Sequence, residues 1–216
     1  MMRDVLIREW LVASRSLGEL GQTLLFMLLV LVLFPLAISP DRAVLEQVGL
    51  GAVWIMSLLA MLSAAEHTIA PDLKSGALEQ MVLSEIPLWW QTVAKAVMHW
   101  LTIGLPIIVM SPLICLMLAV EGQYWPWIMA ALTLTTPILS LLCILGASLT
   151  AGLNAGSALM PVLVAPLMMP PLIFGTQWAY HMGEAFYGYV LAALLSLTLV
   201  VVPWVVSYAL QVAASR

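Results

Sequence analysis

Long apolar runs dominate this chain and leave few ways for it to fold in water. Runs of about 20 apolar residues recur along its 216 residues, and a helix of that length crosses a hydrocarbon layer of about 30 Å. Charged residues make up 8% of the chain, against roughly 25% in a soluble domain. The runs are continuous rather than alternating, which argues against the strands of a transmembrane barrel. The sequence therefore predicts an all-α integral membrane protein with a single domain over residues 1–216.

Polar turns divide the apolar sequence into six predicted transmembrane helices. We expect the third to be kinked or broken, because it contains Pro106 and Pro112 and proline removes a backbone donor. The fifth holds four prolines and is not expected to be one straight helix, and the sixth is expected to be interrupted near Pro203. The predicted spans cover residues 20–38, 48–65, 94–120, 127–149, 158–178 and 187–210.

Residues 2–17 have a different pattern, in which apolar side chains recur at a helical spacing. Apolar residues fall at positions 2, 6, 10, 13 and 17, whereas Arg8, Arg15 and Glu19 lie largely off that stripe. Such a helix, with a net positive charge, suits the surface of an anionic leaflet. We predict an N-terminal amphipathic interfacial helix, with an extension of the first span as the alternative. No cleaved signal peptide is expected.

Basic residues are distributed unevenly between the two predicted faces. Six spans put both termini on one side, and the positive-inside rule identifies that side as the cytoplasm. Arg42 is the one basic residue predicted on the opposite face. The cytoplasmic face is predicted to hold Arg3, Arg8, Arg15, Lys74, Lys95 and Arg216. Both termini and the long polar segment between the second and third spans are therefore expected in the cytoplasm.

That polar segment, residues 66–91, is the longest in the chain. We predict a short helix within it that is capped by Ser75, because a hydroxyl side chain can satisfy free amide groups at a helix start. Pro87 prevents this helix from running straight into the third span. The short helix is therefore expected to lie at the cytoplasmic surface.

One face of the short helix is apolar and its rim is acidic. Leu78, Met81 and Val82 share the apolar face, with Glu79 and Gln80 beside them. A helix of this kind suits docking into a groove on a soluble partner. The alternative is an interfacial helix that binds only lipid headgroups, although an anionic leaflet disfavours so acidic a segment.

Three ionisable residues near the ends of this segment have both functional and structural interpretations. Glu66 and Lys95 form a candidate ionisable pair at the base of the loop, since charged groups at the membrane are functional candidates. Snorkelling of each side chain to the interface is the alternative. The third, His99, is a candidate ligand because imidazole binds metal ions, although a lone membrane histidine is more often a hydrogen-bonded structural residue.

The sequence contains little that would support chemistry by the chain itself. It lacks the glycine-rich ATP-binding loop, a Ser/His/Asp arrangement and paired catalytic carboxylates. Cys115 and Cys143 lie inside apolar runs without the spacing of a metal site, so we expect small buried thiols. We therefore predict no catalytic residue, no metal site and, without a basic patch, no nucleic-acid partner.

The polar segment has an acidic residue, then Gly-x-Leu-Glu-Gln, then a proline, and is similar to that of ABC-2 exporter permeases. Further motifs lie at residues 33–36, Glu66, 72–80, 95–100, 104–106 and 111–113. Together these motifs cover nearly the whole chain and resemble those of the CcmB family, the haem exporter protein B permeases of cytochrome c maturation.

The resemblance implies an ABC-type complex in a bacterial inner membrane. Its expected partners are a CcmA-like ATPase, CcmC-like and CcmD-like membrane proteins, a CcmE-like haem chaperone and a second permease copy. ATP would bind the ATPase and haem would be the cargo. His99 would then be a candidate haem contact, because imidazole ligates haem iron. ATP hydrolysis would be linked to haem export or to release of the haem-loaded chaperone in the periplasm. A non-transporting membrane scaffold for a haem-handling complex is the alternative.

The resemblance also gives the short helix a role, as the coupling helix that sits in a groove of the ATPase. Leu78, Glu79 and Gln80 would contact the ATPase, while Asp72 and Gly76 would shape the turn before them. The fold it implies is an ABC-2 exporter-like permease with six spans. The chain itself would be a permease subunit and not an enzyme.

Overall fold

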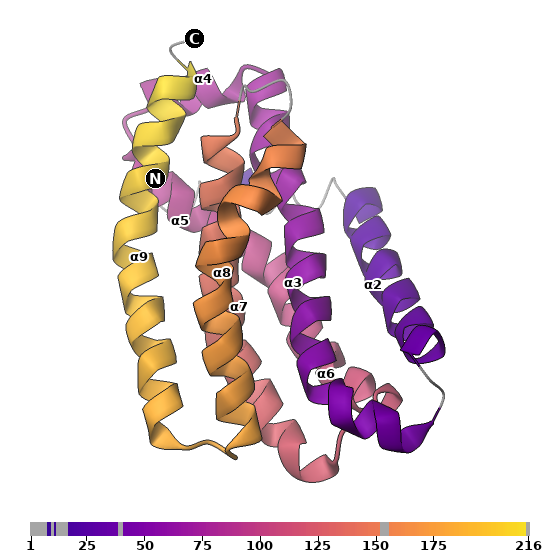
Figure 1. Cartoon of the computed structure of the whole chain (residues 1–216). Helices are drawn as coiled ribbons and strands as arrows, with labels where there is room; N and C mark the ends of the chain where they lie inside the picture. The colour runs from indigo at the N-terminus through magenta and orange to yellow at the C-terminus, as the bar shows by residue number, and fades with distance from the viewer. Residues whose placement is uncertain (1–7, 10, 12–16, 39–40, 152–155, 215–216) are drawn as a thin grey trace.

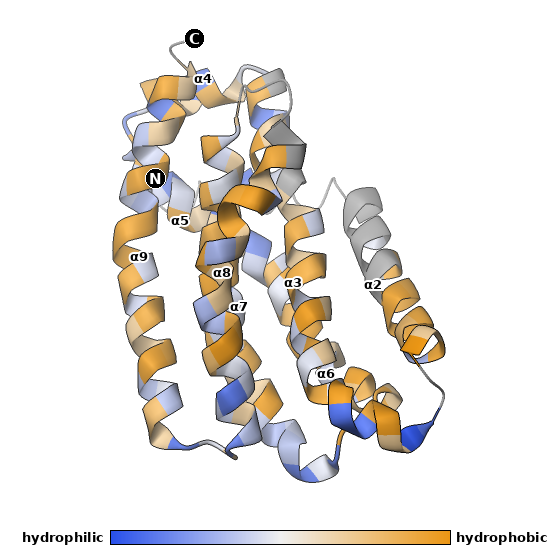
Figure 2. Ribbon diagram, viewed as in Figure 1, coloured by the Kyte–Doolittle hydropathy of each residue, from blue (hydrophilic) through white to orange (hydrophobic). Residues whose placement is uncertain are grey.

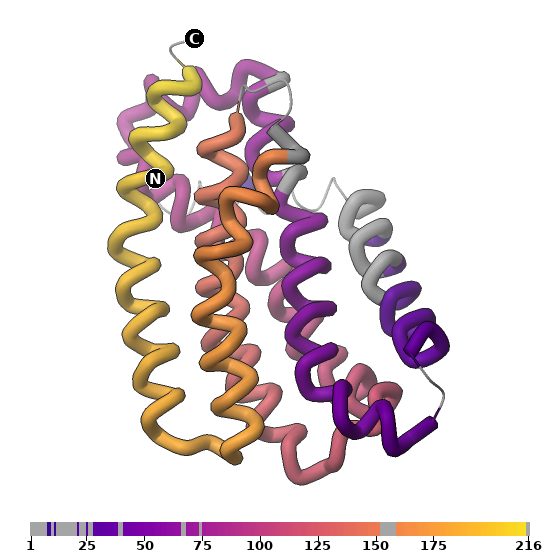
Figure 3. The backbone as a smooth tube through the Cα atoms, in the orientation of Figure 1, coloured from indigo at the N-terminus to yellow at the C-terminus, as the bar shows by residue number. Residues whose placement is uncertain are grey.

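The computed structural model describes residues 8–9, 11, 17–38, 41–151 and 156–214, which form helices joined by short turns (Figures 1 and 3). No strand occurs among these described residues. In chain order the helices are α2 (Leu17–Ile38), α3 (Arg42–Lys74), α4 (Ala77–Leu83), α5 (Leu88–His99), η1 (Trp100–Gly104), α6 (Leu105–Met117), η2 (Gly122–Tyr124), α7 (Trp125–Leu149), α8 (Gly156–Tyr180) and α9 (Ala185–Ala214).

Five helical stretches of the described chain are long and apolar enough to cross a membrane. Apolar residues dominate their length, whereas polar residues collect at the turns between them (Figure 2). The predicted all-α membrane class is confirmed by these helices. In α2, the described apolar stretch is the shorter Leu28–Ile38. The five long stretches are Arg42–Leu73, Leu88–Met117, Gly122–Leu149, Leu159–Tyr180 and Ala185–Ala214.

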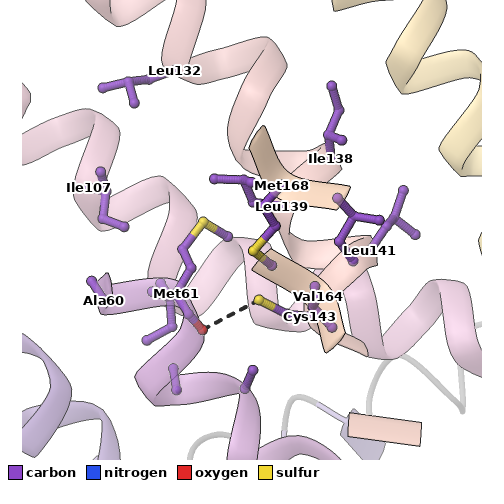
Figure 4. Packing of buried hydrophobic residues seen from close by; sticks show 14 of the residues in the cluster. Ala60, Met61, Ile107, Leu132, Ile138, Leu139, Leu141, Cys143, Val164 and Met168 are labelled. Atoms are coloured by element: carbon purple, nitrogen blue, oxygen red, sulfur yellow. Dashed lines mark hydrogen bonds between the residues drawn. The ribbon is translucent and has the colours of Figure 1, made fainter. Parts of the chain in front are cut away.

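Helix α7 occupies the centre of the bundle and packs against α3, α5, α6, α8 and α9. Its side chains from Ile138 to Ser148 are all buried. Figure 4 shows Leu139 and Cys143 of α7 beside Met168 of α8, with the Cys143 thiol 3.6 Å from the Met61 carbonyl oxygen of α3. Both cysteines are free and buried, as predicted. Close packing of this kind fills the interior of the bundle with side chains.

The third predicted span is interrupted, as its prolines indicated. Helices α5 and α6 are joined through η1, a turn of π-helix in which the Leu105 amide donates to the Trp100 carbonyl oxygen. Pro106 follows immediately and has no amide hydrogen to continue the regular α-helical pattern. The Trp100 indole Nε1 donates to Thr136 Oγ1 of α7 at 2.9 Å, which fixes the wider turn against the central helix.

Two predictions about where helices end or break are wrong. Helix α3 continues to Lys74 instead of ending near residue 65, and Pro71 lies inside its last turns. Helix α9 runs through Pro203 without interruption. In an apolar environment each broken backbone hydrogen bond leaves unsatisfied groups, so one bond lost to proline costs less than opening the helix around it. A long helix therefore tolerates a single proline.

Helix α8 is assigned as one helix despite Pro161, Pro166, Pro170 and Pro171. Its first part runs obliquely before the helix turns into line with α7 (Figure 1), so it is not straight, as expected. The predicted interfacial helix over residues 2–17 lies largely outside the described residues. Arg8, Glu9 and Leu11 are described there, and each is helical.

Candidate functional site at the α4 end

A tight turn connects α3 to α4 at one end of the bundle. Ser75 ends α3: its backbone amide and its hydroxyl both bind the Pro71 carbonyl oxygen, the hydroxyl at 2.8 Å. Ser75 was predicted to be the N-cap of the next helix. That prediction is wrong, because Ser75 is the C-cap of α3. Gly76 is the N-cap of α4 and has φ +72°, a left-handed conformation that glycine adopts without strain. Gly76 thus lies at the turn between α3 and α4.

Helix α4 has one buried face and one exposed face. Leu78 and Met81 are buried to 1% and 4% exposure, and they pack into the apolar core of this chain. The prediction that they form an apolar face open to a partner is therefore wrong, because the chain's own core takes that face. Glu79 and Gln80 are exposed, and Leu83 at the end of α4 is 85% exposed. The exposed surface of α4 is formed mainly by these three residues.

Gln91 of α5 fixes the link that follows α4. Its side-chain amide lies 3.0 Å from the Met81 carbonyl oxygen, 2.9 Å from Ser84 Oγ and 3.0 Å from the Ile86 carbonyl oxygen. Gln91 is itself buried, so these contacts satisfy a polar group that would otherwise be costly. Pro87 is the N-cap of α5 and separates it from α4, as predicted. The α4 helix is thereby held at a fixed angle to α5.

Four charged side chains meet beside α4, and we call them the charge cluster. Lys95 of α5 donates to Glu9 Oε2 at 3.1 Å and to Asp72 Oδ2 of α3. Arg8 lies with Nη1 3.3 Å from Glu9 Oε1 and Nη2 3.5 Å from Asp72 Oδ1. Two positive and two negative groups balance, and Glu9, Asp72 and Lys95 are buried. The charge cluster ties the N-terminal segment to α3 and α5.

The charge cluster revises two predicted roles. Asp72 does not stand at the turn before α4 but binds Lys95 and Arg8 one turn of helix earlier. Lys95 is buried against Glu9 and Asp72, not snorkelling to the surface. The side chain of Glu66, the partner predicted for Lys95, lies outside the described residues, although its backbone belongs to α3.

A hollow of about 250 Å³ opens next to the charge cluster. Arg8, the exposed residue Gln80 of α4, Ser84 and Gln91 are among the residues that line it. The α4 end therefore combines an exposed helix face with a small recess.

His99 follows Lys95 by one turn of α5 and lies in the interior, between α5 and α7. It is 4% exposed, and its Nδ1 is 3.1 Å from Ser140 Oγ of α7. Its other ring nitrogen, Nε2, is buried and makes no hydrogen bond of regular geometry with the described residues. A porphyrin cannot reach an imidazole packed in this way unless α5 and α7 separate. The structural interpretation of His99 therefore fits the packing better than haem contact.

Arg8, Glu9 and Gln91 were missed from the sequence as site residues. A signal for the first two was present, because an ionisable group at a membrane helix end needs a partner. Pairing Lys95 and Asp72 with charges predicted on the same side would have pointed to residues 8 and 9. Nothing in the local pattern identifies Gln91, since two of its three acceptors are backbone carbonyl groups, one in α4 and one in the link that follows it.

Comparison with known proteins places the chain in a family. It matches the CcmB protein family over residues 1–213. A Pseudomonas aeruginosa protein named heme exporter protein B is 38% identical, over 98% of this chain and 97% of that protein. A Haemophilus influenzae protein of the same name is 40% identical, over 81% of this chain and 79% of that protein. A third, from Escherichia coli strain K12, is 36% identical over 94% of each chain. This chain therefore belongs to the CcmB protein family.

Proposed function

We propose that this chain is the permease subunit of an ATP-driven membrane complex that handles haem during cytochrome c maturation. Its membership of the CcmB family and the name heme exporter protein B of its relatives support haem as the cargo. Its five long apolar helices support a role within the membrane. ATP would be bound by a partner ATPase, because this sequence lacks an ATP-binding loop.

The contact with that ATPase is proposed to be the exposed face of α4. The observation that carries this proposal is the attachment of α4, which is short but held at several points. Leu78 and Met81 anchor it in the core, Gln91 fixes its end, and the charge cluster braces the adjoining ends of α3 and α5. A push on α4 would therefore move α3 and α5 with it. Rigid connected elements of this kind can carry a displacement across a membrane.

We further propose that the α4 end faces the cytoplasm and that α2 is a sixth span. Arg8 and Lys95 bind Asp72, near the end of α3 that leads into α4, whereas Arg42 begins α3. The start of α3 lies at the opposite end of the bundle from α4 (Figure 1). Glu9 also binds Lys95 and Asp41 precedes α3, so the chain between them has to run from the α4 end toward the opposite end. At 1.5 Å per residue, the 22 residues of α2 extend about 33 Å. That length matches a hydrocarbon core of about 30 Å.

The packed centre of the bundle bears on where haem would move. Since α7 fills the centre of the helix bundle, a path for haem through a single copy would require the helices of that copy to separate. Haem would then pass at a contact between two copies or with another membrane subunit, or it would stay outside while the complex drives release of a haem-loaded chaperone. Both versions use α4 in the same way. We propose the second, because it requires no opening of the core.

The test is to change the exposed face of α4 and measure binding to the ATPase. In the assembled complex, Glu79→Lys and Leu83→Ser should each weaken co-purification of the ATPase more than about tenfold, as expected for residues central to an interface. ATP-dependent release of haem-loaded chaperone should fall in parallel. The matched control is Glu121→Lys, which makes the same charge change at an exposed position at the other end of the bundle.

Two results would count against the proposal. If the ATPase still co-purifies with both α4 variants and chaperone release is unchanged, α4 is not the docking surface. If the complex assembles normally and chaperone release proceeds without ATP hydrolysis, the chain is an assembly scaffold and not a coupling subunit. Thermal unfolding of each variant checks that its membrane domain is intact.

A further inference from the structure

A cluster of aromatic side chains surrounds His181 at the end of the bundle opposite α4 (Figure 1). It is built from the end of α8, the start of α9 and the turn before α7. Tyr180 is 57% exposed and Phe186 is 60% exposed, and His181 itself is exposed. The members of this cluster are Tyr124, Phe174, Tyr180, His181, Phe186 and Tyr187.

Rings in the cluster form both stacked and edge-on pairs. The His181 imidazole is parallel to the Tyr187 ring, with centroids 5.1 Å apart and an interplanar angle of 9°. It meets the Tyr180 ring edge-on, at 5.3 Å and 86°. Tyr180 in turn stacks on Tyr124 at 6.3 Å and 5°. Geometries like these are favourable for aromatic pairs and hold each ring in place.

The turn that carries His181 is tightly held. Met182 and Gly183 both have positive φ, at +46° and +86°, and the Gly183 amide donates to the Trp178 carbonyl oxygen at 2.9 Å. A methyl group on Gly183 would lie 2.0 Å from the Trp127 ring, so this position has no room for a side chain. A non-glycine residue in the left-handed region is strained, and strain of this kind is found at functional sites. His181 is thus presented on a defined backbone.

An interfacial aromatic belt would explain the tyrosines but gives no reason for the histidine. Such belts are built from Trp and Tyr, which sit at the headgroup level. Among the described residues, no hydrogen bond is made to the imidazole ring of His181. A neutral imidazole has a nitrogen lone pair that can bind iron, and haem is commonly held by histidine. Flat aromatic rings beside it can stack on the face or edge of a porphyrin.

We propose that His181 and its neighbouring tyrosine rings form a haem-binding platform at the end opposite α4. The inference rests on the proposed function, since haem is the cargo assumed there. His181 would donate a nitrogen lone pair to the iron, and the rings of Tyr187 and Tyr180 would contact the porphyrin. A single histidine ligand leaves the other axial position of the iron open to a ligand from a second protein. Transfer would then exchange one iron ligand for another, with no change in oxidation state.

The experiment is a titration of the purified full chain, in lipid nanodiscs, with ferric haem. We expect saturable binding with a shifted Soret band and the electron paramagnetic resonance signal of an imidazole-bound ferric haem. His181→Phe keeps an aromatic ring but removes the ligand, and it should abolish that signal and weaken binding more than tenfold. Tyr187→Leu should weaken binding about threefold to tenfold while keeping the imidazole signal. His67→Ala is the matched control and should bind as the unaltered chain does.

The proposal is overturned if His181→Phe binds haem with the same affinity and the same spectrum as the unaltered chain. It is also overturned if His67→Ala and His181→Phe lose binding to the same extent. These outcomes are independent of the α4 experiment. Loss of ATPase docking in the α4 variants together with unchanged haem binding by His181→Phe would leave the proposed function standing without this platform.

Discussion

The Lys95 side chain is 5% exposed, so the charge of its ammonium group has to be compensated inside the protein. Two carboxylates lie within reach of it. Glu9 and Asp72 supply the opposite charge, and Arg8 balances the second carboxylate. Taking these groups out of water costs several kcal/mol for each ion, which their mutual attraction offsets when the set is complete. Each of the four charged groups therefore stabilises the fold only while the other three are present.

Replacing Lys95 tests this dependence. Lys95→Met leaves Glu9 and Asp72 buried with Arg8 as their one remaining cation in the charge cluster, so we expect a loss of about 3–5 kcal/mol in the free energy of unfolding. Thermal unfolding in detergent measures it. The control is Arg42→Met, which removes an ion pair to Glu46 at 2.9 Å in which Arg42 is 82% exposed. That exposed pair should contribute no more than about 1 kcal/mol.

A small difference between the two variants would show that the charge cluster is not compensating a buried charge. A second comparison separates the charge from the shape of the side chain. Lys95→Arg keeps the positive charge and should retain more stability than Lys95→Met does, although a guanidinium group does not fit the same space. If Lys95→Met is the more stable of the two, the attraction to Glu9 and Asp72 has been overestimated.

At the scale of the element, α4 has two leucines with opposite environments. Leu78 is 1% exposed in the core and Leu83 is 85% exposed. Leu78→Ala should lower the free energy of unfolding by about 2–5 kcal/mol, because it leaves a cavity. Leu83→Ala should change it by less than about 0.5 kcal/mol, as is usual on a surface. The measurement is thermal unfolding of both variants of the isolated chain.

Equal stability of the two leucine variants would contradict the orientation of α4. The same contrast explains why a substitution of Leu78 cannot test docking by itself. A charge at position 78 would be buried in the core and would damage the fold before it affected a partner. The exposed residues Glu79 and Leu83 are the ones that can separate docking from folding.

Local sequence signals predicted the boundary after α4 but not the one before it. Pro87 acts through the backbone of its own position, so its effect on the chain can be predicted from residue type. The cap before α4 was assigned to Ser75, whereas Gly76 takes that place. Which face of α4 is buried depends on helices far away in sequence, and the apolar face of Leu78 and Met81 fits a partner's groove as well as it fits the chain's core. The end of α3 was missed because Pro71 and polar residues suggested a loop, whereas the helix persists.

At the scale of the whole molecule, the membrane class and five of the long helices follow from hydropathy alone. The contacts that define the site do not, because Glu9 and Lys95 are separated by 86 positions in the chain. Periodicity within one helix carries no information on such a pair. The requirement that a buried charge be compensated does predict such a pair, provided that both ends of every helix are first assigned to a side of the membrane. Topology is therefore the step on which the site prediction depends.

That topology can be tested with single cysteines. Cys115 and Cys143 are free and buried, so a chain with both replaced by alanine provides an unreactive background. Ser84 is exposed at the α4 end and Gln123 is exposed at the opposite end. Each is replaced by cysteine in turn, and spheroplasts are treated with a maleimide that cannot cross the membrane. A third variant, Ser16→Cys, places the cysteine just before α2.

We expect Gln123→Cys to be labelled in intact spheroplasts, and Ser84→Cys to be labelled after the membrane is opened. Ser16→Cys should behave as Ser84→Cys does, because α2 has to carry the chain from the α4 end to the start of α3. Labelling of Ser16→Cys from outside, together with Gln123→Cys, would mean that α2 does not cross the membrane. Labelling of Ser84→Cys from outside would invert the whole orientation. It would also remove the cytoplasmic ATPase contact, since α4 would then face the periplasm.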